Sequence, residues 1–173
     1  MGVDISGLEL RCLSHYLALY DHGEYGKKLL EEDIHTVNQE AAGLATRDQA
    51  KTFIYGFLYG AGDQKIGEIV GKGSTEGKKL KKKFLSQLPA LKQLRKDVQK
   101  KAKQGFLRGL DGRGVPVRSK HAALNTLLQS AGAIICKRWV VETHRLLTEN
   151  GFKCGHDFSQ VAFVHDEIQL TVK

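Results

Sequence analysis

The segment from Val161 to Val172 reads VAFVHDEIQLTV, and its pattern decides the fold class of the chain. Two apolar arms, VAFV and IQL, flank the polar triplet HDE at residues 165–167. Short apolar arms around a polar turn are typical of a β-hairpin. Together with a strand at residues 2–5 and helical patterns between the two, this hairpin predicts an α+β fold.

Apolar residues at helical spacing predict most of the remaining elements. Thr46 is placed to cap a helix, Pro89 interrupts a strongly cationic helical region, and Gly151 ends a long helix. Asp111-Gly112 is a turn signal of the hairpin type. The predicted elements are a strand at 2–5, helices at 8–20 and 46–59, a cationic helical region at 75–103, a turn at 110–114 and a helix at 122–150.

The charge of the chain is compatible with a polyanionic partner. It has 27 Lys and Arg against 19 Asp and Glu, a formal net charge of +8. Cations that neutralise phosphates release counterions, which drives sequence-independent binding to nucleic acid. A basic protein without such a partner explains the charge equally well, because charge runs such as that at residues 78–83 are usually solvated helix faces.

The three cysteines, Cys12, Cys136 and Cys154, are scattered and form no CxxC pair. Neither a zinc site nor a disulfide framework is indicated, and this favours a reducing compartment. The sequence contains no signal-peptide pattern and no apolar run near the ~18 residues that a membrane span requires. We therefore expect a cytoplasmic location (host cytoplasm if a phage encodes the protein) and no membrane partner.

Carboxylates interrupt two of the predicted apolar strands. Asp4 follows Val3 in the first strand, and Asp166 and Glu167 lie at the tip of the hairpin. An ionised carboxylate is costly in an apolar setting unless it is paired or binds a cation. Brought together on neighbouring strands, Asp4 and Asp166 would suit Mg²⁺, which favours carboxylates together with substrate phosphates. Alternatively, Asp4 caps the helix that follows it, and Asp166 is an ordinary turn residue.

Four residues of the helix at 46–59 are spaced four apart: Arg47, Lys51, Tyr55 and Tyr59. Each step of four advances about 40° around an α-helix, so they lie on one stripe, opposite the apolar residues. A guanidinium, an ammonium and two aromatic rings in line suit the phosphates, sugar and base of a nucleoside triphosphate. The alternative is a solvated polar face with two half-buried tyrosines.

Three segments resemble motifs of the family A DNA polymerases. DISGLELR at residues 4–11 is similar to motif A, RDQAKTFIYGFLYG at 47–60 to motif B, and VHDE at 164–167 to motif C. AALNTLLQSAGA at 122–133 also matches, in particular the podophage replicative branch. Because the motifs follow the family's order and span nearly the whole chain, the chain is identified as a catalytic core of this family.

The resemblance implies a polymerase palm, a small antiparallel sheet with helices, joined to a helical fingers subdomain. The palm would comprise residues 1–16 and 125–173, and the fingers residues 17–124. The family's thumb and exonuclease-like regions have no counterpart here, and the segment between Lys103 and Gly109 is short for the podophage branch. We expect a second polypeptide that supplies the missing parts, or a truncated, designed or minimal core.

The resemblance also implies the chemistry of DNA replication: Mg²⁺-dependent transfer of a deoxynucleotide to a primer 3′-hydroxyl, with release of pyrophosphate. Asp4 and Asp166 would bind two Mg²⁺ ions, helped by the backbone carbonyl of Ile5. Lys51 would assist the departure of pyrophosphate. Glu167 would complete the catalytic set.

The partners implied are a dNTP and primer–template DNA. Arg47, Lys51 and His35 would hold the triphosphate, Tyr55 would line the sugar pocket, and Glu9 would crowd the 2′ position and exclude ribonucleotides. The implied nucleotide-binding set is Ile5, Glu9, His35, Arg47, Lys51 and Tyr55. The implied DNA-binding set is Tyr59 near the template base, His121, Asn125 and Gln129 in the minor groove, and His165 at the primer terminus.

Two of these residues have competing explanations. Ser6-Gly7-Leu8-Glu9 has the spacing of a capping box, so Glu9 would then only secure the start of a helix. Gln129 lies in an apolar helix, where it would be a hydrogen-bonded core amide. Asn125, one turn earlier on the same face, favours a shared contact with DNA instead.

Two other functions stay open at this point. A single-subunit RNA polymerase shares the catalytic aspartates and the Arg–Lys–Tyr helix, although Glu9 and Glu167 favour DNA synthesis. A nucleic-acid-binding protein without catalytic turnover would explain the charge but not the motifs.

Overall fold

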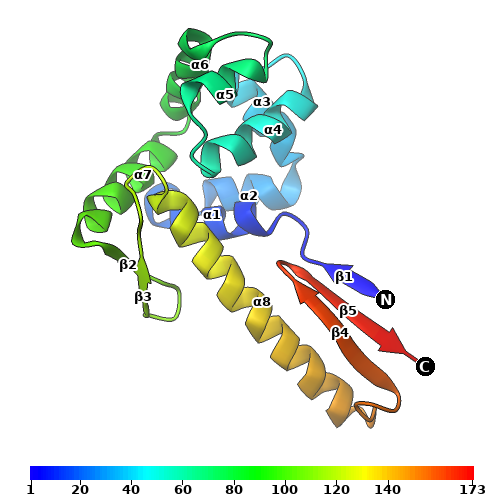
Figure 1. The fold of residues 1–173 in the computed structure, drawn as a ribbon. Coiled ribbons are helices and arrows are strands. Elements are labelled where there is room, and N and C mark those ends of the chain that lie inside the picture. The colour runs from blue at the N-terminus through cyan, green and yellow to red at the C-terminus, as the bar shows by residue number, and fades with distance from the viewer.

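The computed structural model describes residues 1–173, and Figure 1 shows a small sheet beside a long helix, with a layer of shorter helices beyond one end of both. The sheet has the strand order β1-β5-β4, with β1 at Gly2–Asp4, β4 at Phe158–Val164 and β5 at Glu167–Val172. The long helix α8 spans Ala123–Glu149. The α+β fold class predicted from the sequence is confirmed.

The C-terminal hairpin forms as predicted and organises the sheet. β4 and β5 pair antiparallel with Val164 opposite Glu167, so only His165 and Asp166 form the turn. His165 adopts a left-handed backbone with φ 56°, which is uncommon for a residue other than glycine. β1 pairs antiparallel with the other edge of β5, which sets Asp4 opposite Glu167. The two carboxylate-bearing segments are therefore neighbours.

Seven helices make up the helical layer and its connection to α8. They are α1 (Leu8–Asp21), α2 (Glu24–Glu31), α3 (Ile34–Ala42), α4 (Arg47–Leu58), α5 (Asp63–Glu68), α6 (Ser74–Gln87) and α7 (Pro89–Lys101). A 3₁₀ turn, η1 (Ala102–Gln104), leads into the hairpin β2 (Phe106–Arg108) and β3 (Gly114–Pro116), around the predicted turn. Sequence periodicity identified α1, α4 and the α6–α7 pair, but not α2, α3 or α5.

Local signals in the sequence explain where the predicted helices begin and end. The Thr46 side chain accepts from the backbone N–H of Gln49, and the Gln49 side chain accepts in return, so α4 starts with a capping box. Pro89 occupies the first turn of α7, where its missing N–H costs nothing. Gly151, with φ 88°, ends the C-terminal side of α8.

The main core lies where α1, α4, α6, α7 and the first half of α8 meet. Phe84 of α6 packs edge-on against Phe53 and Phe57 of α4, with ring centroids 5.1 and 5.4 Å apart. Leu13 of α1 and Phe53 are fully buried. This core holds α4 rigidly by its apolar face and leaves the opposite face free, as the spacing predicted. None of the helices combines the length and the apolar run that a transmembrane span needs.

Candidate active site

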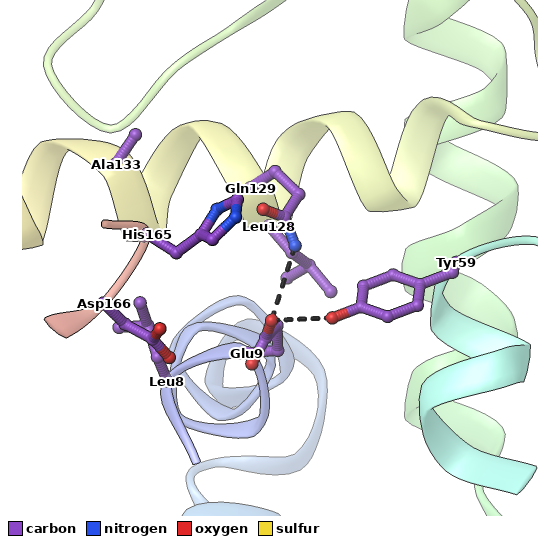
Figure 2. A pocket seen from close by; sticks show the side chains of 9 residues that line it. Leu8, Glu9, Tyr59, Leu128, Gln129, Ala133, His165 and Asp166 are labelled. Atoms are coloured by element: carbon purple, nitrogen blue, oxygen red, sulfur yellow. Dashed lines mark hydrogen bonds between the residues drawn. The ribbon is translucent and has the colours of Figure 1, made fainter. Parts of the chain in front are cut away.

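A hollow of about 470 Å³ opens between the start of α1, the end of α4, the middle of α8 and the β4–β5 turn. Figure 2 shows the side chains that line it. Glu9 comes from α1, Tyr59 from the end of α4, Gln129 from α8, and His165 and Asp166 from the turn. Five predicted site residues, distant in sequence, therefore share one pocket.

Glu9 lies at the centre of the polar contacts in this pocket (Figure 2). The Tyr59 hydroxyl donates to Oε1 of Glu9 at 2.8 Å, and Nε2 of Gln129 donates to the same oxygen at 3.4 Å. α1 has Gly7 as its N-cap, with no side-chain cap, so the capping-box explanation of Glu9 is wrong. Gln129 is exposed to the pocket, so it is not a core amide.

The two tyrosines of α4 stay protonated near neutral pH. Burial, and then the hydrogen bond to Glu9, raise the pKa of Tyr59 to about 12. Burial and the negative charges of Glu9 and Asp166 also raise the pKa of Tyr55. Tyr59 is therefore a steady hydrogen-bond donor to Glu9, while the Tyr55 hydroxyl has no partner within the chain.

Asp4 and Asp166 present free carboxylates at one edge of the sheet. Neither carboxylate accepts a side-chain hydrogen bond or joins an ion pair, so Asp4 does not cap α1. The backbone N–H of Ile5 donates to the carbonyl of Asp166 at 3.1 Å, which ties the two segments together, and the Ile5 carbonyl accepts no hydrogen bond. No group of three or more His, Cys, Asp or Glu side chains converges as a metal cluster.

The carboxylates of this region also act on a buried thiol of α8. Cys136, on α8, is fully buried, and its pKa is raised first by burial and then by the charges of Asp166, Asp4 and Glu9. The three carboxylates come from β1, α1 and the hairpin turn.

Glu167 sits beside this edge on β5. Its Oε1 accepts from Nε2 of Gln169 at 3.1 Å. A Cβ on Gly2 would lie 2.7 Å from the same oxygen, so the missing side chain of Gly2 makes room for Glu167. Glu167 therefore has a place on the sheet next to Asp4 without an ion pair.

The free face of α4 continues from the pocket toward α3. The rings of Tyr55 and Tyr59 are 6.3 Å apart, and the ring of His35, in α3, is 6.2 Å from that of Tyr55. Lys51 is exposed and forms no ion pair. Burial, together with the charges of Arg47 and Lys51, lowers the pKa of His35, whose Nδ1 is buried without a partner. Arg47, Lys51 and His35 therefore belong to the same region of the surface.

Arg47 has a partner that sequence reasoning missed. Its guanidinium pairs with the carboxylate of Asp33, the N-cap of α3. The hydrogen bond from Arg47 is the main reason that the pKa of Asp33 falls to about 2. Asp33 was not singled out from the sequence, because nothing local links the cap of α3 to the first residue of α4.

The remaining predicted DNA contacts lie along the start of α8. Asn125 has a buried Oδ1 without a hydrogen-bond partner. His121 lies outside the main pocket and lines a second hollow of about 480 Å³, with Gly60, Lys78 and Arg95. Asn125 and His121 are therefore not brought into contact with Glu9, whereas Gln129 is. Gly132, which packs against Leu8 in the pocket wall, was also not singled out from the sequence.

A small antiparallel sheet with free carboxylates, faced by a helix that carries Arg, Lys and two Tyr, has the palm-and-fingers architecture of nucleic-acid polymerases. The family model for DNA polymerase family A matches residues 1–173. The chain therefore belongs to DNA polymerase family A, as its three motifs predicted.

Individual relatives agree with this assignment. The chain is 56% identical over 189 residues to the DNA-directed DNA polymerase of Enterobacteria phage T3, covering 99% of this chain and 27% of that protein. It is 57% identical over 186 residues to the enzyme of the same description from Escherichia phage T7, covering 98% of this chain and 26% of that protein. The predicted podophage type is confirmed, and the chain spans about a quarter of these relatives.

A solved structure is similar in fold. The POL domain of Pol1 from M. smegmatis, in complex with DNA primer-template and dNTP, superposes with a TM-score of 0.80 at 21% identity. The match covers 99% of this chain and 33% of that one. It confirms the palm-and-fingers fold class predicted from the sequence.

Proposed function

We propose that this chain is the catalytic core of a DNA-directed DNA polymerase that acts in phage DNA replication. It would add a deoxynucleotide from a dNTP to a primer 3′-hydroxyl and release pyrophosphate. The observation that carries this proposal is the pair of free carboxylates, Asp4 and Asp166, on neighbouring segments beside the pocket that Tyr59, at the end of α4, lines. Membership of family A supports the same reaction.

The donor set at the sheet edge fits Mg²⁺. It consists of oxygens only, those of Asp4, Asp166 and the Ile5 carbonyl, and none is engaged by another protein group. Hard divalent cations of this kind prefer oxygen ligands and share them with substrate phosphates. Two bound Mg²⁺ ions would stabilise charge on the attacking and leaving oxygens of the transfer. Glu167, the remaining member of the proposed catalytic set, adds negative charge at the same edge.

The face of α4 would bind the nucleotide. Arg47, Lys51 and His35 would offer charge and hydrogen bonds to the triphosphate, and Lys51 would offset the charge that develops as pyrophosphate leaves. Tyr55 would contact the sugar. Glu9, held by Tyr59 and Gln129, would stand at the 2′ position, where a ribonucleotide carries an extra hydroxyl.

Primer–template DNA would lie over the same pocket. Tyr59 would face the template base, and Gln129 and Asn125 the minor groove, whose acceptors are similar for all base pairs. His121 would contact the template nearby, and His165 the primer terminus.

Removal of either strand aspartate tests this function. Asp4→Ala and Asp166→Ala should each abolish Mg²⁺-dependent primer extension, by at least about a thousandfold, with primer–template affinity almost unchanged. Losing a metal ligand removes transition-state stabilisation, whereas duplex affinity depends mainly on phosphate contacts. Glu40→Ala, which removes an exposed carboxylate of α3 that forms no side-chain hydrogen bond or ion pair, is the control and should extend normally.

The same assay separates the two rival functions. Ribonucleotide incorporation as fast as that of deoxynucleotides would favour an RNA polymerase. Binding of DNA without extension, even when further palm and thumb segments are supplied, would favour an inert nucleic-acid-binding protein. We further propose that additional polypeptide, in the same chain or a second one, grips the duplex. Supporting this, Ile135, Val141 and Leu146 of α8 are exposed.

A further inference from the structure

Asp33 makes two kinds of contact in the structure. Its Oδ1 accepts from the backbone N–H of His35 at 3.2 Å, and its Oδ2 accepts from the Thr36 hydroxyl at 3.0 Å, so it caps α3. The same carboxylate also receives Nε of Arg47 on Oδ2 and Nη2 of Arg47 on Oδ1, the latter at 3.2 Å. The pair between α3 and α4 is therefore bidentate.

Capping α3 requires a hydrogen-bond acceptor at position 33 but not a negative charge. An asparagine or a serine caps a helix about as well as an aspartate does. What only a carboxylate provides is the charge and the second oxygen for the guanidinium fork. The pair with Arg47 is therefore a separate contribution of this residue.

The surroundings of Arg47 are otherwise those of an anion site. Lys51 follows one turn along α4, and the His35 ring lies 6.2 Å from that of Tyr55 on the same face; burial, and then the charges of Arg47 and Lys51, lower the pKa of His35. Asp33 is the one carboxylate that forms an ion pair with this group. It occupies the Nε and Nη2 edge of Arg47, the edge that also binds a phosphate in a bidentate manner.

We propose that Asp33 is a built-in placeholder for a phosphate of the nucleotide: it holds Arg47 while the site is empty and is displaced when the triphosphate binds. The inference rests on the proposed function, because it takes Arg47 to be a triphosphate ligand. In this proposal Asp33 positions Arg47, and its competition for Arg47 lowers the affinity of the site for a triphosphate.

Displacement of Asp33 is inexpensive for two reasons. The Arg47 and Asp33 side chains remain 52% and 42% exposed, and ion pairs this exposed are weak. After Arg47 leaves, the carboxylate keeps its hydrogen bonds to His35 and Thr36, so it is not left unpaired. A triphosphate carries several negative charges and Asp33 only one, so the triphosphate displaces Asp33 from Arg47.

Asp33→Asn is the deciding substitution, since it keeps the shape and the cap but removes the charge. The probe is inorganic tripolyphosphate, titrated calorimetrically into the full chain. Loss of the competing carboxylate should tighten binding about threefold. Asp48→Asn, which removes a charge from the first turn of α4 without breaking an ion pair, is the matched control and should change affinity much less. Asp33→Ser, a second cap-competent variant, should behave as Asp33→Asn does.

A double-mutant cycle gives the specific signature. In the Arg47→Gln variant there is no guanidinium for Asp33 and tripolyphosphate to compete for. Adding Asp33→Asn to that variant should therefore tighten tripolyphosphate binding no more than adding Asp48→Asn does. Parent binding that depends on Arg47 but is unchanged or weakened by Asp33→Asn would overturn the placeholder and leave the proposed function standing. Binding that ignores Arg47, or no binding by parent and Asp33→Asn alike, would overturn both the placeholder and the assignment of Arg47 as a triphosphate ligand, whereas loss of the proposed function would appear only in primer extension.

Discussion

At the scale of single residues, two tyrosines one turn apart on α4 have different tasks. The Tyr59 hydroxyl is occupied, because it donates to Glu9 at 2.8 Å. The Tyr55 hydroxyl has no protein partner, although its ring is half-buried between His35 and Tyr59. A free phenol at the proposed sugar pocket is available to hydrogen-bond a substrate.

This difference leads to a prediction about dideoxynucleotides. When a substrate lacks its 3′-hydroxyl, the Tyr55 phenol can take its place as the hydrogen-bond partner of a neighbouring triphosphate oxygen. Tyr55→Phe would leave that oxygen unpaired, at a cost of about 1–3 kcal/mol. Termination should fall by about tenfold or more, while ordinary extension is spared.

Competition between dideoxy and deoxy substrates, with the chain supplemented by palm and thumb segments where needed, measures this ratio. Tyr20→Phe, which removes a hydroxyl that donates to Asp97 far from the pocket, serves as the comparison. A ratio unchanged by Tyr55→Phe would mean that the Tyr55 hydroxyl does not reach the nucleotide.

At the scale of elements, α5 and α6 are packed backbone against backbone. A Cβ on Gly77 of α6 would lie 1.8 Å from the carbonyl oxygen of Asp63, and one on Gly67 of α5 would lie 2.1 Å from that of Gly73. Neither obstacle is a flexible side chain. The close crossing brings Lys81 onto Asp63 at 2.9 Å and so fixes the turn that follows α4.

Gly77→Ala should therefore be strongly destabilising. Overpacking of this kind costs about 3 kcal/mol, since backbone must shift, and for a domain of this size that lowers Tm by about 6–12 °C. Thermal unfolding followed by circular dichroism measures the change. Gly26→Ala is the control, because a Cβ on this residue of α2 would meet Ser14 Cβ at 3.6 Å, an ordinary contact, and alanine favours a helix, so Tm should not fall.

At the scale of the whole molecule, positive charge is concentrated in one region. Residues 74–103, which form α6, α7 and η1, contain eleven Lys and Arg against two acidic residues. This region alone exceeds the formal net charge of +8, so the rest of the chain is close to neutral. It adjoins the second hollow, where Lys78 and Arg95 have no acidic partner.

We expect this region to carry much of the salt-dependent affinity for DNA. Changing Lys78, Lys82 and Lys92 together to Gln should reduce the slope of log affinity against log salt. Each lost phosphate contact changes that slope by about 0.9 for duplex and about 0.7 for single-stranded DNA, so the reduction should reach about 2–3.

Fluorescence anisotropy with a primer–template over a salt series measures the slope. Changing Lys27, Lys153 and Lys173 together removes the same charge from exposed positions elsewhere. An equal reduction by both triple variants would mean that net charge, and not this region, governs binding.

The sequence by itself determined the features that depend on neighbouring residues. Thr46 and Gln49 begin α4, Pro89 separates α6 from α7, and Gly151 ends α8, because caps and breakers act over a few positions. The apolar arms around the polar turn predicted β4 and β5 as well, although β4 begins three residues earlier, at Phe158. The motifs of family A could also be recognised from the sequence, since each is a continuous segment.

The short helices α2, α3 and α5 were not predicted. They have 8, 9 and 6 residues, too few for apolar periodicity to stand out. Isolated helices of this length are marginal, so their stability comes from packing against other parts of the chain.

Only the tertiary structure decided between the alternatives at the site. Glu9 has the spacing of a capping box, yet its partners are Tyr59 and Gln129, which lie 50 and 120 positions away. Arg47 likewise pairs with Asp33, the residue that caps another helix, α3. Local propensity says which helix a side chain stands on, but the partner that satisfies its charge or hydrogen bond is chosen when distant segments pack together.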